Sequence, residues 1–244
     1  MKELSDIEEI RRNYSSMHEN LGSINGRYEG HDRTSALISW SEFASERAMK
    51  LIYFFRTIEQ FEQLNENDRF ILIKYNLYPL YILQKCLFFD PISRRFIPRN
   101  PSSDPMKRGE FFRLCYGSTG VREIFRNLIY SLSIVTERDS TLVSLLLLIL
   151  LFSKGLSMNE NENYLNNSKN VFQIQSYYVH LLWNYLLSKH GYIQTIRQFD
   201  QLIQQIHKLQ FYTQFFREFF QRENQTTDLV QKLAPLMQTV LNIN

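Results

Sequence analysis

Apolar residues recur every three or four positions along most of the chain, which is the spacing that places them on one face of an α-helix. Asn65 and Asp68 have the spacing of a capping box, so a helix is expected to start near Glu66. Another amphipathic helix precedes Asn65. Segment 54–89 is therefore expected to contain two amphipathic helices joined at a polar corner around Asn65 and Asp68. The first helix is expected to run from about Trp40 to Phe61, and its apolar stripe consists of Trp40, Ala44, Ala48, Leu51, Ile52, Phe55, Ile58 and Phe61.

Further helices are predicted by the same spacing in the rest of the chain. Segment 141–152 is apolar on nearly all sides, so we expect it in the middle of the domain, with Asp139 and Ser140 at its start. Pro79 interrupts the helix after Asn65, and we expect a kink three or four residues before it. The other predicted helices are 7–17, 110–116, 121–136, 169–190, 195–222 and 229–241.

Polar and proline-rich segments separate these helices. Loops are expected at 21–34 and 157–168, which are rich in Gly, Asn, Ser or charged residues. Segment 90–105 holds four of the six prolines and cannot be regular helix. Within it, Arg95, Phe96 and Ile97 are expected to form one arm of a small hairpin. The pattern therefore predicts an all-α chain with one small β-turn.

Length and composition narrow the class of protein. A chain of 244 residues suits one domain, 1–244, with one sizeable core. A net charge of +3 is too slight to indicate nucleic-acid contact. Cys86 and Cys115, the only cysteines, are expected to be buried, reduced thiols, and two cysteines cannot form a zinc finger.

The sequence contains no motif for catalysis, metal binding or membrane insertion. Its five histidines lack metal-ligand spacing, and it has neither a Gly-rich phosphate loop nor a nucleophile elbow, so we expect no enzyme and no metal site. The charged N-terminus is no signal peptide. The apolar run 142–152 would span only about 17 Å as a helix, against a hydrocarbon core of about 30 Å, so no membrane contact is expected.

Segment 61–74 resembles the signature of nuclear receptor ligand-binding domains, in which a Phe and Leu pair precedes Asp-Gln and an apolar run closed by a basic residue. The similarity is strongest to the retinoid-related orphan and peroxisome proliferator receptors. The order of helices agrees over essentially the whole chain, and 138–156 resembles the eighth helix of the family. This resemblance implies a three-layer antiparallel helical sandwich with a small β-turn. The matching residues are Phe61, Leu64, Asp68, Arg69 in place of Gln, Ile71, Leu72, Ile73 and Lys74.

The resemblance implies a groove for a coregulator helix of LxxLL type. Arg56 and Lys74 would bond the free carbonyls at the C-terminus of the docked helix. In the alternative interpretation, these two residues are simply solvated. Thr239 stands where the family has Glu, so the opposite end of the docked helix should be held less well. We expect the affinity for the coregulator helix to be roughly tenfold to a hundredfold lower as a result. The other groove residues implied are Ile52, Phe70, Ile73, Leu236, Met237 and Val240.

The resemblance also implies an internal pocket. It is either filled by its own large side chains or occupied by a lipophilic ligand, fatty acid or steroid-like. Arg47 and Lys85 favour an acidic ligand, because an inward-facing cation is costly unless it is paired. The arginine that several receptors use for ligand acids is absent, with Leu87 or Phe88 at its position. The pocket residues implied are Trp40, Phe43, Ala44, Arg47, Leu77, Tyr78, Tyr81 and Lys85.

The function implied is regulation of transcription in the nucleus, with the cytoplasm as the alternative location. The chain would bind coregulator helices and a nuclear receptor partner, in a homodimer or heterodimer through helix 195–222. Pro79 replaces a family Glu to which dimer contacts are attributed. Two alternatives remain: a receptor-like module without a DNA-binding half that dimerises with and restrains other receptors, and a soluble lipid-binding carrier.

Overall fold

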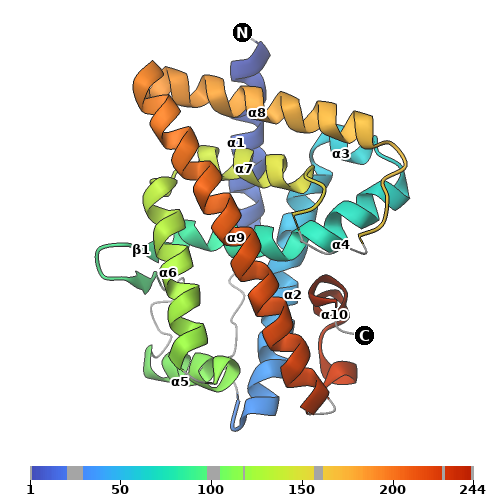
Figure 1. Cartoon of the computed structure of the whole chain (residues 1–244), viewed down its shortest axis with the longest axis vertical. Helices are drawn as coiled ribbons and strands as arrows, with labels where there is room; N and C mark the ends of the chain where they lie inside the picture. Colours follow the sequence, from blue (N-terminus) through green and yellow to red (C-terminus); the bar gives the residue numbers. More distant parts are fainter. Residues whose placement is uncertain are drawn as a thin grey trace.

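The structure, a computed structural model, describes residues 2–20, 30–97, 105–117, 119–156, 162–226 and 229–242. Within these residues the chain forms ten α-helices, two short 3₁₀ helices and one two-stranded sheet (Figure 1). The all-α fold with a small β-turn is therefore confirmed. Three predicted loop segments, 21–34, 90–105 and 157–168, lie partly outside the described residues. The parts outside are 21–29, 98–104 and 157–161, respectively.

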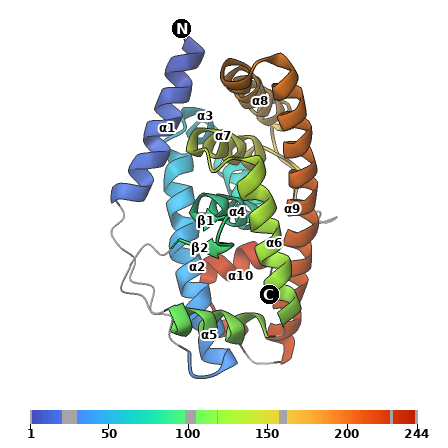
Figure 2. The same ribbon diagram turned by 90° about the vertical axis from the view of Figure 1, so that its left-hand side faces the viewer.

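The helices are arranged in three layers, which Figure 2 shows edge-on. On one side lie α1 (Lys2–Asn20) and α2 (Arg33–Arg56). The middle contains α3 (Glu59–Glu62), α4 (Glu66–Leu83), the 3₁₀ helix η1 (Gln84–Phe88) and α7 (Ser140–Leu151). The third layer consists of α6 (Thr119–Val135), α8 (Ser168–His190) and α9 (Tyr192–Thr226), while α5 (Pro105–Tyr116) closes one end.

Helix α7 forms the centre of the core, as its nearly continuous apolar sequence predicts. All its residues from 141 to 151 are buried, and it packs against α8, α4 and α1. Asp139 begins the helix by accepting hydrogen bonds from the backbone N–H groups of Thr141 (2.9 Å) and Leu142 (3.1 Å). A helix surrounded by other helices has no polar face to present, which is why its sequence lacks amphipathic periodicity.

The predicted bounds of α2 were wrong at both ends. The helix starts at Arg33, because Asp32 and Ser35 form a capping box well before Trp40. It ends at Arg56 and not at Phe61, since Ile58 is extended and a separate short helix, α3, follows. The Thr57 hydroxyl stabilises the break by donating to the Phe54 carbonyl at 2.7 Å.

Helix α4 and the hairpin agree with the sequence pattern. Asn65 accepts a hydrogen bond from the backbone N–H of Asp68 at 2.9 Å, and α4 starts at Glu66. It continues through Pro79 to Leu83. Strands β1 (Phe89–Asp90) and β2 (Arg95–Phe96) then pair antiparallel, with Phe89 opposite Phe96. The predicted helices 7–17, 110–116, 121–136, 169–190 and 195–222 are present as α1, α5, α6, α8 and α9.

The predicted single helix 229–241 was wrong. The structure has the 3₁₀ helix η2 (Val230–Lys232), an extended Leu233 and then α10 (Pro235–Leu241). Proline at the first position of a helix fits its fixed φ, but it disfavours helical geometry in the residue before it, here Ala234. Residue 235 therefore marks a helix start that apolar spacing alone did not show.

Helix α10 packs against α4, α2 and α9. It lies across the part of the molecule where these three helices approach one another (Figures 1 and 2). In the part of the chain that the structure describes, no helix combines the length and apolar character needed to cross a membrane.

Candidate functional site

The carboxylate of Asp68 organises the polar corner between α3 and α4. It is fully buried and accepts hydrogen bonds from the backbone N–H groups of Asn166 (2.6 Å) and Asn167 (3.1 Å), and from the Asn65 side chain (2.8 Å). Asn167 in turn caps the start of α8. The corner was predicted as a reciprocal capping box, but only the Asn65 half is present, because Asp68 bonds the chain that leads into α8.

One side of the predicted groove contains a shared ion pair. Arg56 Nε lies 3.0 Å from Glu62 Oε1, and Arg69 Nη1 lies 2.7 Å from Glu62 Oε2. The Arg56 side chain is still 63% exposed, so it can reach a partner. Lys74, the second predicted cation, is half-buried with its Nζ 5.3 Å from the centre of the Tyr75 ring. One carboxylate between two arginines leaves this edge net positive.

Apolar side chains lie beside these cations on α2 and α4. Phe70 is 55% exposed, and Tyr53, which the sequence did not single out, is 50% exposed. Ile52 and Ile73 are half-buried and pack against the core. Large exposed apolar side chains next to charged ones are typical of surfaces that bind partners.

The residues predicted on the final helix divide between the core and the surface. Met237 and Val240 are buried and anchor α10. Leu236 and Thr239 are half-buried, and the Thr239 hydroxyl donates to the Pro235 carbonyl at 3.1 Å. The Thr239 hydroxyl therefore bonds within its own helix.

Helix α10 is also held by Arg217 and Gln221 of α9, which sequence reasoning missed. Arg217 Nε donates to the Val240 carbonyl, and Gln221 donates to the Leu241 carbonyl, both at 3.2 Å. Burial lowers the pKa of Arg217 to about 10, so the guanidinium is charged at neutral pH. Its position between the pairs Phe215–Phe216 and Phe219–Phe220 was a signal of burial.

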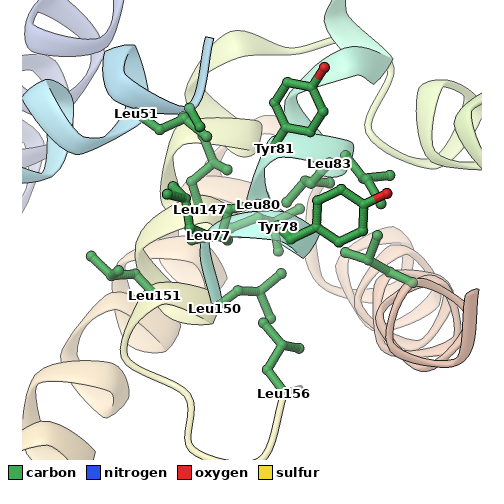
Figure 3. Close-up of a cluster of buried hydrophobic side chains, with 14 of the residues drawn as sticks. Leu51, Leu77, Tyr78, Leu80, Tyr81, Leu83, Leu147, Leu150, Leu151 and Leu156 are labelled. Carbon is green, nitrogen blue, oxygen red and sulfur yellow. The ribbon is translucent and has the colours of Figure 1, made fainter. Parts of the chain in front are cut away.

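Three predicted pocket residues of α4 lie in the apolar core. Figure 3 shows Leu77, Tyr78 and Tyr81 among leucines of α2, α4 and α7. The two tyrosine rings stack with centroids 6.3 Å apart, and Lys85 Nζ lies 4.0 Å from the centre of the Tyr81 ring. Burial raises the pKa of Tyr78 well above its ordinary value, so it stays protonated. Lys85 thus has an aromatic face as a cation–π partner.

The predicted pocket residues of α2 are also packed against aromatic rings. The Trp40 ring stacks on Phe220 at 4.4 Å. Ala44 is fully buried. The Arg47 guanidinium lies 4.9 Å from the centre of the half-buried Phe43 ring, and its buried Nε has no hydrogen-bond partner among the residues that the structure describes.

The outer face of α9 carries a third candidate surface, which starts just before the predicted dimer helix 195–222 and continues along it. At 100° per residue, its apolar side chains fall in an arc of about 100°, which is one face of the helix. Between about 43% and 67% of each is exposed. This α9 stripe consists of Tyr192, Ile193, Ile196, Ile203 and Phe211.

Within the described ranges, no three His, Cys, Asp or Glu side chains are grouped closely enough to hold a metal ion. Compared with known proteins, the sequence matches no protein-family model and no curated protein. The exposed apolar and basic side chains on α2 and α4, the half-buried cations Arg47 and Lys85, and the α9 stripe are therefore the candidate binding features among the described residues.

Proposed function

We propose that this chain is a nuclear receptor-like ligand-binding and dimerisation domain that regulates transcription by binding coregulator helices of LxxLL type. The peptide helix binds beside Phe70, with Arg56 and Lys74 bonding the carbonyls at its C-terminus. The clamp is weak at its other end, where Thr239 replaces an acid. Dimerisation with a receptor partner uses the α9 stripe.

The observation that carries this proposal is the position of α10. This helix packs against both α2 and α4, the two helices that carry the basic and apolar residues of the groove. A short apolar helix is bound well by an exposed apolar surface with cations at one edge, because the cations complement the negative end of its dipole. Phe70 and Tyr53 supply exposed apolar area, and Arg56 and Lys74 supply the charge.

The test is the affinity of a fluorescein-labelled LxxLL peptide, measured by fluorescence anisotropy. We expect the Arg56→Ala, Lys74→Ala double variant to bind roughly tenfold to a hundredfold more weakly, because each cation bonds a helix-terminal carbonyl. Arg11→Ala is the matched control, since Arg11 is exposed and paired with Glu8 much as Arg56 is paired with Glu62. Equal binding by the double variant and the native chain would contradict the proposal.

Glu62→Gln is a second variant with the opposite expected sign. It removes the carboxylate that Arg56 and Arg69 share. Arg56 then has no ion pair with Glu62 to give up when it binds the peptide, so the affinity for the peptide should rise. Tighter binding than in the native chain supports a direct contact of Arg56 with the peptide. Weaker binding would mean that the Glu62 ion pairs serve to shape the groove.

A second candidate function, binding of a lipophilic acid, is favoured by one specific observation. Arg47 has a buried Nε without a hydrogen-bond partner among the described residues, and a carboxylate would satisfy it. Native mass spectrometry after gentle purification tests this candidate with oleic acid as the added probe. A bound fatty acid that Arg47→Met loses supports the function, and an empty protein at saturating oleic acid contradicts it.

A further inference from the structure

Pro79 leaves one backbone carbonyl of α4 without its helical partner. In an α-helix the carbonyl of residue 75 accepts from the N–H of residue 79, and proline has no N–H. The proline ring also crowds the carbonyl of the residue four positions earlier, here Tyr75. The Tyr75 carbonyl is instead bonded by Arg217 of α9, whose Nη2 lies 2.8 Å away.

The same guanidinium also bonds the end of α10. The last carbonyls of a helix lack partners within it and need outside donors. Asn242 adopts the left-handed conformation, and its backbone N–H donates to the carbonyls of Gln238 and Thr239. Arg217 Nε bonds the carbonyl of Val240.

Gln221, one turn after Arg217 on α9, also bonds carbonyls at the C-terminal end of α10. Its side-chain amide donates to the carbonyls of Leu241 (3.2 Å) and Asn242 (3.0 Å). The C-terminal end of α10 is therefore satisfied largely by α9, and a cation at this end also complements the helix dipole.

Helix α10 needs such support because it is short. It has seven residues, and helices of that length are not stable in water without tertiary contacts. Its N-terminal side is bonded through the Ala234 N–H to Ser41 Oγ of α2 at 3.0 Å. Its C-terminal side depends on Arg217 and Gln221.

We propose that Pro79 and Arg217 form a latch that holds α10 in place. Pro79 keeps the Tyr75 carbonyl open, so one guanidinium bonds α4 and α10 at the same time. Arg217 is thus a positioning residue, and release of its bond to Val240 loosens the C-terminal side of α10 while the three layers remain folded. The latch does not depend on peptide binding, because it concerns only how α10 is held.

Hydrogen exchange of the backbone amides of α10, followed by mass spectrometry, tests the latch. In Arg217→Met we expect exchange in 236–241 to accelerate roughly tenfold or more, because a charge-assisted bond to the helix end is lost. Exchange in α7 should change much less. Arg222→Met, which removes an exposed arginine from the same helix, is the matched control and should leave α10 unchanged.

Pro79→Ala tests the role of the proline. Alanine restores an N–H that can bond the Tyr75 carbonyl within α4, so the bond from Arg217 to that carbonyl matters less. Arg217→Met should therefore accelerate α10 exchange less in the Pro79→Ala background than in the native one, which is a measurable coupling between the two positions. Strictly additive effects would remove Pro79 from the latch.

Two outcomes would overturn the latch as a whole. One is equal acceleration of exchange in α10 and α7, which would make Arg217 a general stabilising residue. The other is native exchange in α10 of Arg217→Met. Should that variant not fold, Arg217→Lys is used in its place: it keeps the charge, but its single nitrogen cannot reproduce the two-nitrogen bridge, so faster exchange in α10 alone is still expected.

Discussion

Asp68 links two parts of the chain that are about a hundred residues apart. Its carboxylate bonds the backbone of Asn166 and Asn167 and is fully buried. The Asp68 carboxylate therefore has a structural role that needs no ligand, because it fixes the chain at the start of α8. A buried carboxylate with three N–H donors is well satisfied, so removing it leaves donors without partners.

Asp68→Ala should therefore destabilise the protein by about 1.5 to 3 kcal/mol or more, since the bonds involve a charged acceptor. Thermal unfolding followed by circular dichroism measures the effect. Glu66→Ala is the control, because Glu66 lies in the same first turn of α4 but is exposed. A thermal midpoint equal to that of the control would show that water replaces the lost bonds.

The two buried thiols predict a loss of stability at alkaline pH. Burial raises the pKa of Cys86 and of Cys115 to about 12, from an ordinary value of 9.0. Above pH 9 the unfolded chain releases these protons while the folded chain keeps them. Unfolding is therefore favoured as pH rises from about 9 to about 12, by up to about 1.4 kcal/mol per pH unit and thiol.

The Cys86→Ala, Cys115→Ala double variant isolates this effect. Its thermal midpoint should fall less than that of the native protein between pH 8 and pH 10.5, whatever its absolute stability. Other titrating groups are the same in both proteins, so the difference in slope reports the thiols. Identical slopes would contradict the prediction.

At the scale of elements, apolar spacing was a sound guide to where helices lie and a poor guide to where they end. Helix α7 could be placed at the centre because its sequence has no polar face. The end of α2 could not be predicted in this way, because the break at Ile58 lies within a continuous apolar stripe. Pro235 signals the start of α10, because proline suits the first position of a helix and separates α10 from η2.

The sequence places the two cations of the proposed groove on helices, but it does not show the contacts around them. Arg56 and Lys74 lie on α2 and α4 as expected, whereas the role of Glu62 depends on the turn between α2 and α3. Arg217 was missed because it bonds backbone carbonyls of α4 and α10, and the sequence does not show that α9 packs beside these carbonyls. Its only sequence signs were the flanking phenylalanines and the free carbonyl that Pro79 implies.

Helix α10 carries the prediction that belongs to this scale. Thr239→Glu should raise the affinity for the LxxLL peptide roughly tenfold, because it adds an acceptor for the N–H groups at the start of the bound helix. Thr239→Gln is the control, with the same length and no charge, and should raise it less. An acid near the C-terminus of α10 opposes the dipole, so a small loss of stability is also expected.

The measurement is the same anisotropy titration, with Arg56→Ala as a second background. If Thr239→Glu improves binding there as well, the two ends of the clamp act independently. Unchanged affinity in both backgrounds would show that the bound peptide does not reach α10.

At the scale of the whole molecule, the three layers decide which apolar residues stay exposed. The middle layer is covered on both sides, but α9 belongs to an outer layer and has 35 residues, about 52 Å in length. Its inner face packs on α6, α8 and α4, and its outer face carries the α9 stripe. A homodimer built on one helix is two-fold symmetric, so the middle of the stripe lies nearest the axis.

Ile203 lies near the middle of the α9 stripe, so Ile203→Glu should weaken a homodimer most. The substitution places two like charges close together across the axis and removes apolar contact from both copies. Sedimentation velocity should show a dimer for the native chain and a monomer for the variant, and an unchanged circular dichroism spectrum would show that the variant is folded. Gln201→Glu adds the same charge at an exposed position about 160° around α9 from Ile203, outside the α9 stripe, and should leave the dimer intact. A native chain that sediments as a monomer would reject the homodimer, and mixing with a receptor partner would then test the heterodimer through the same pair of variants.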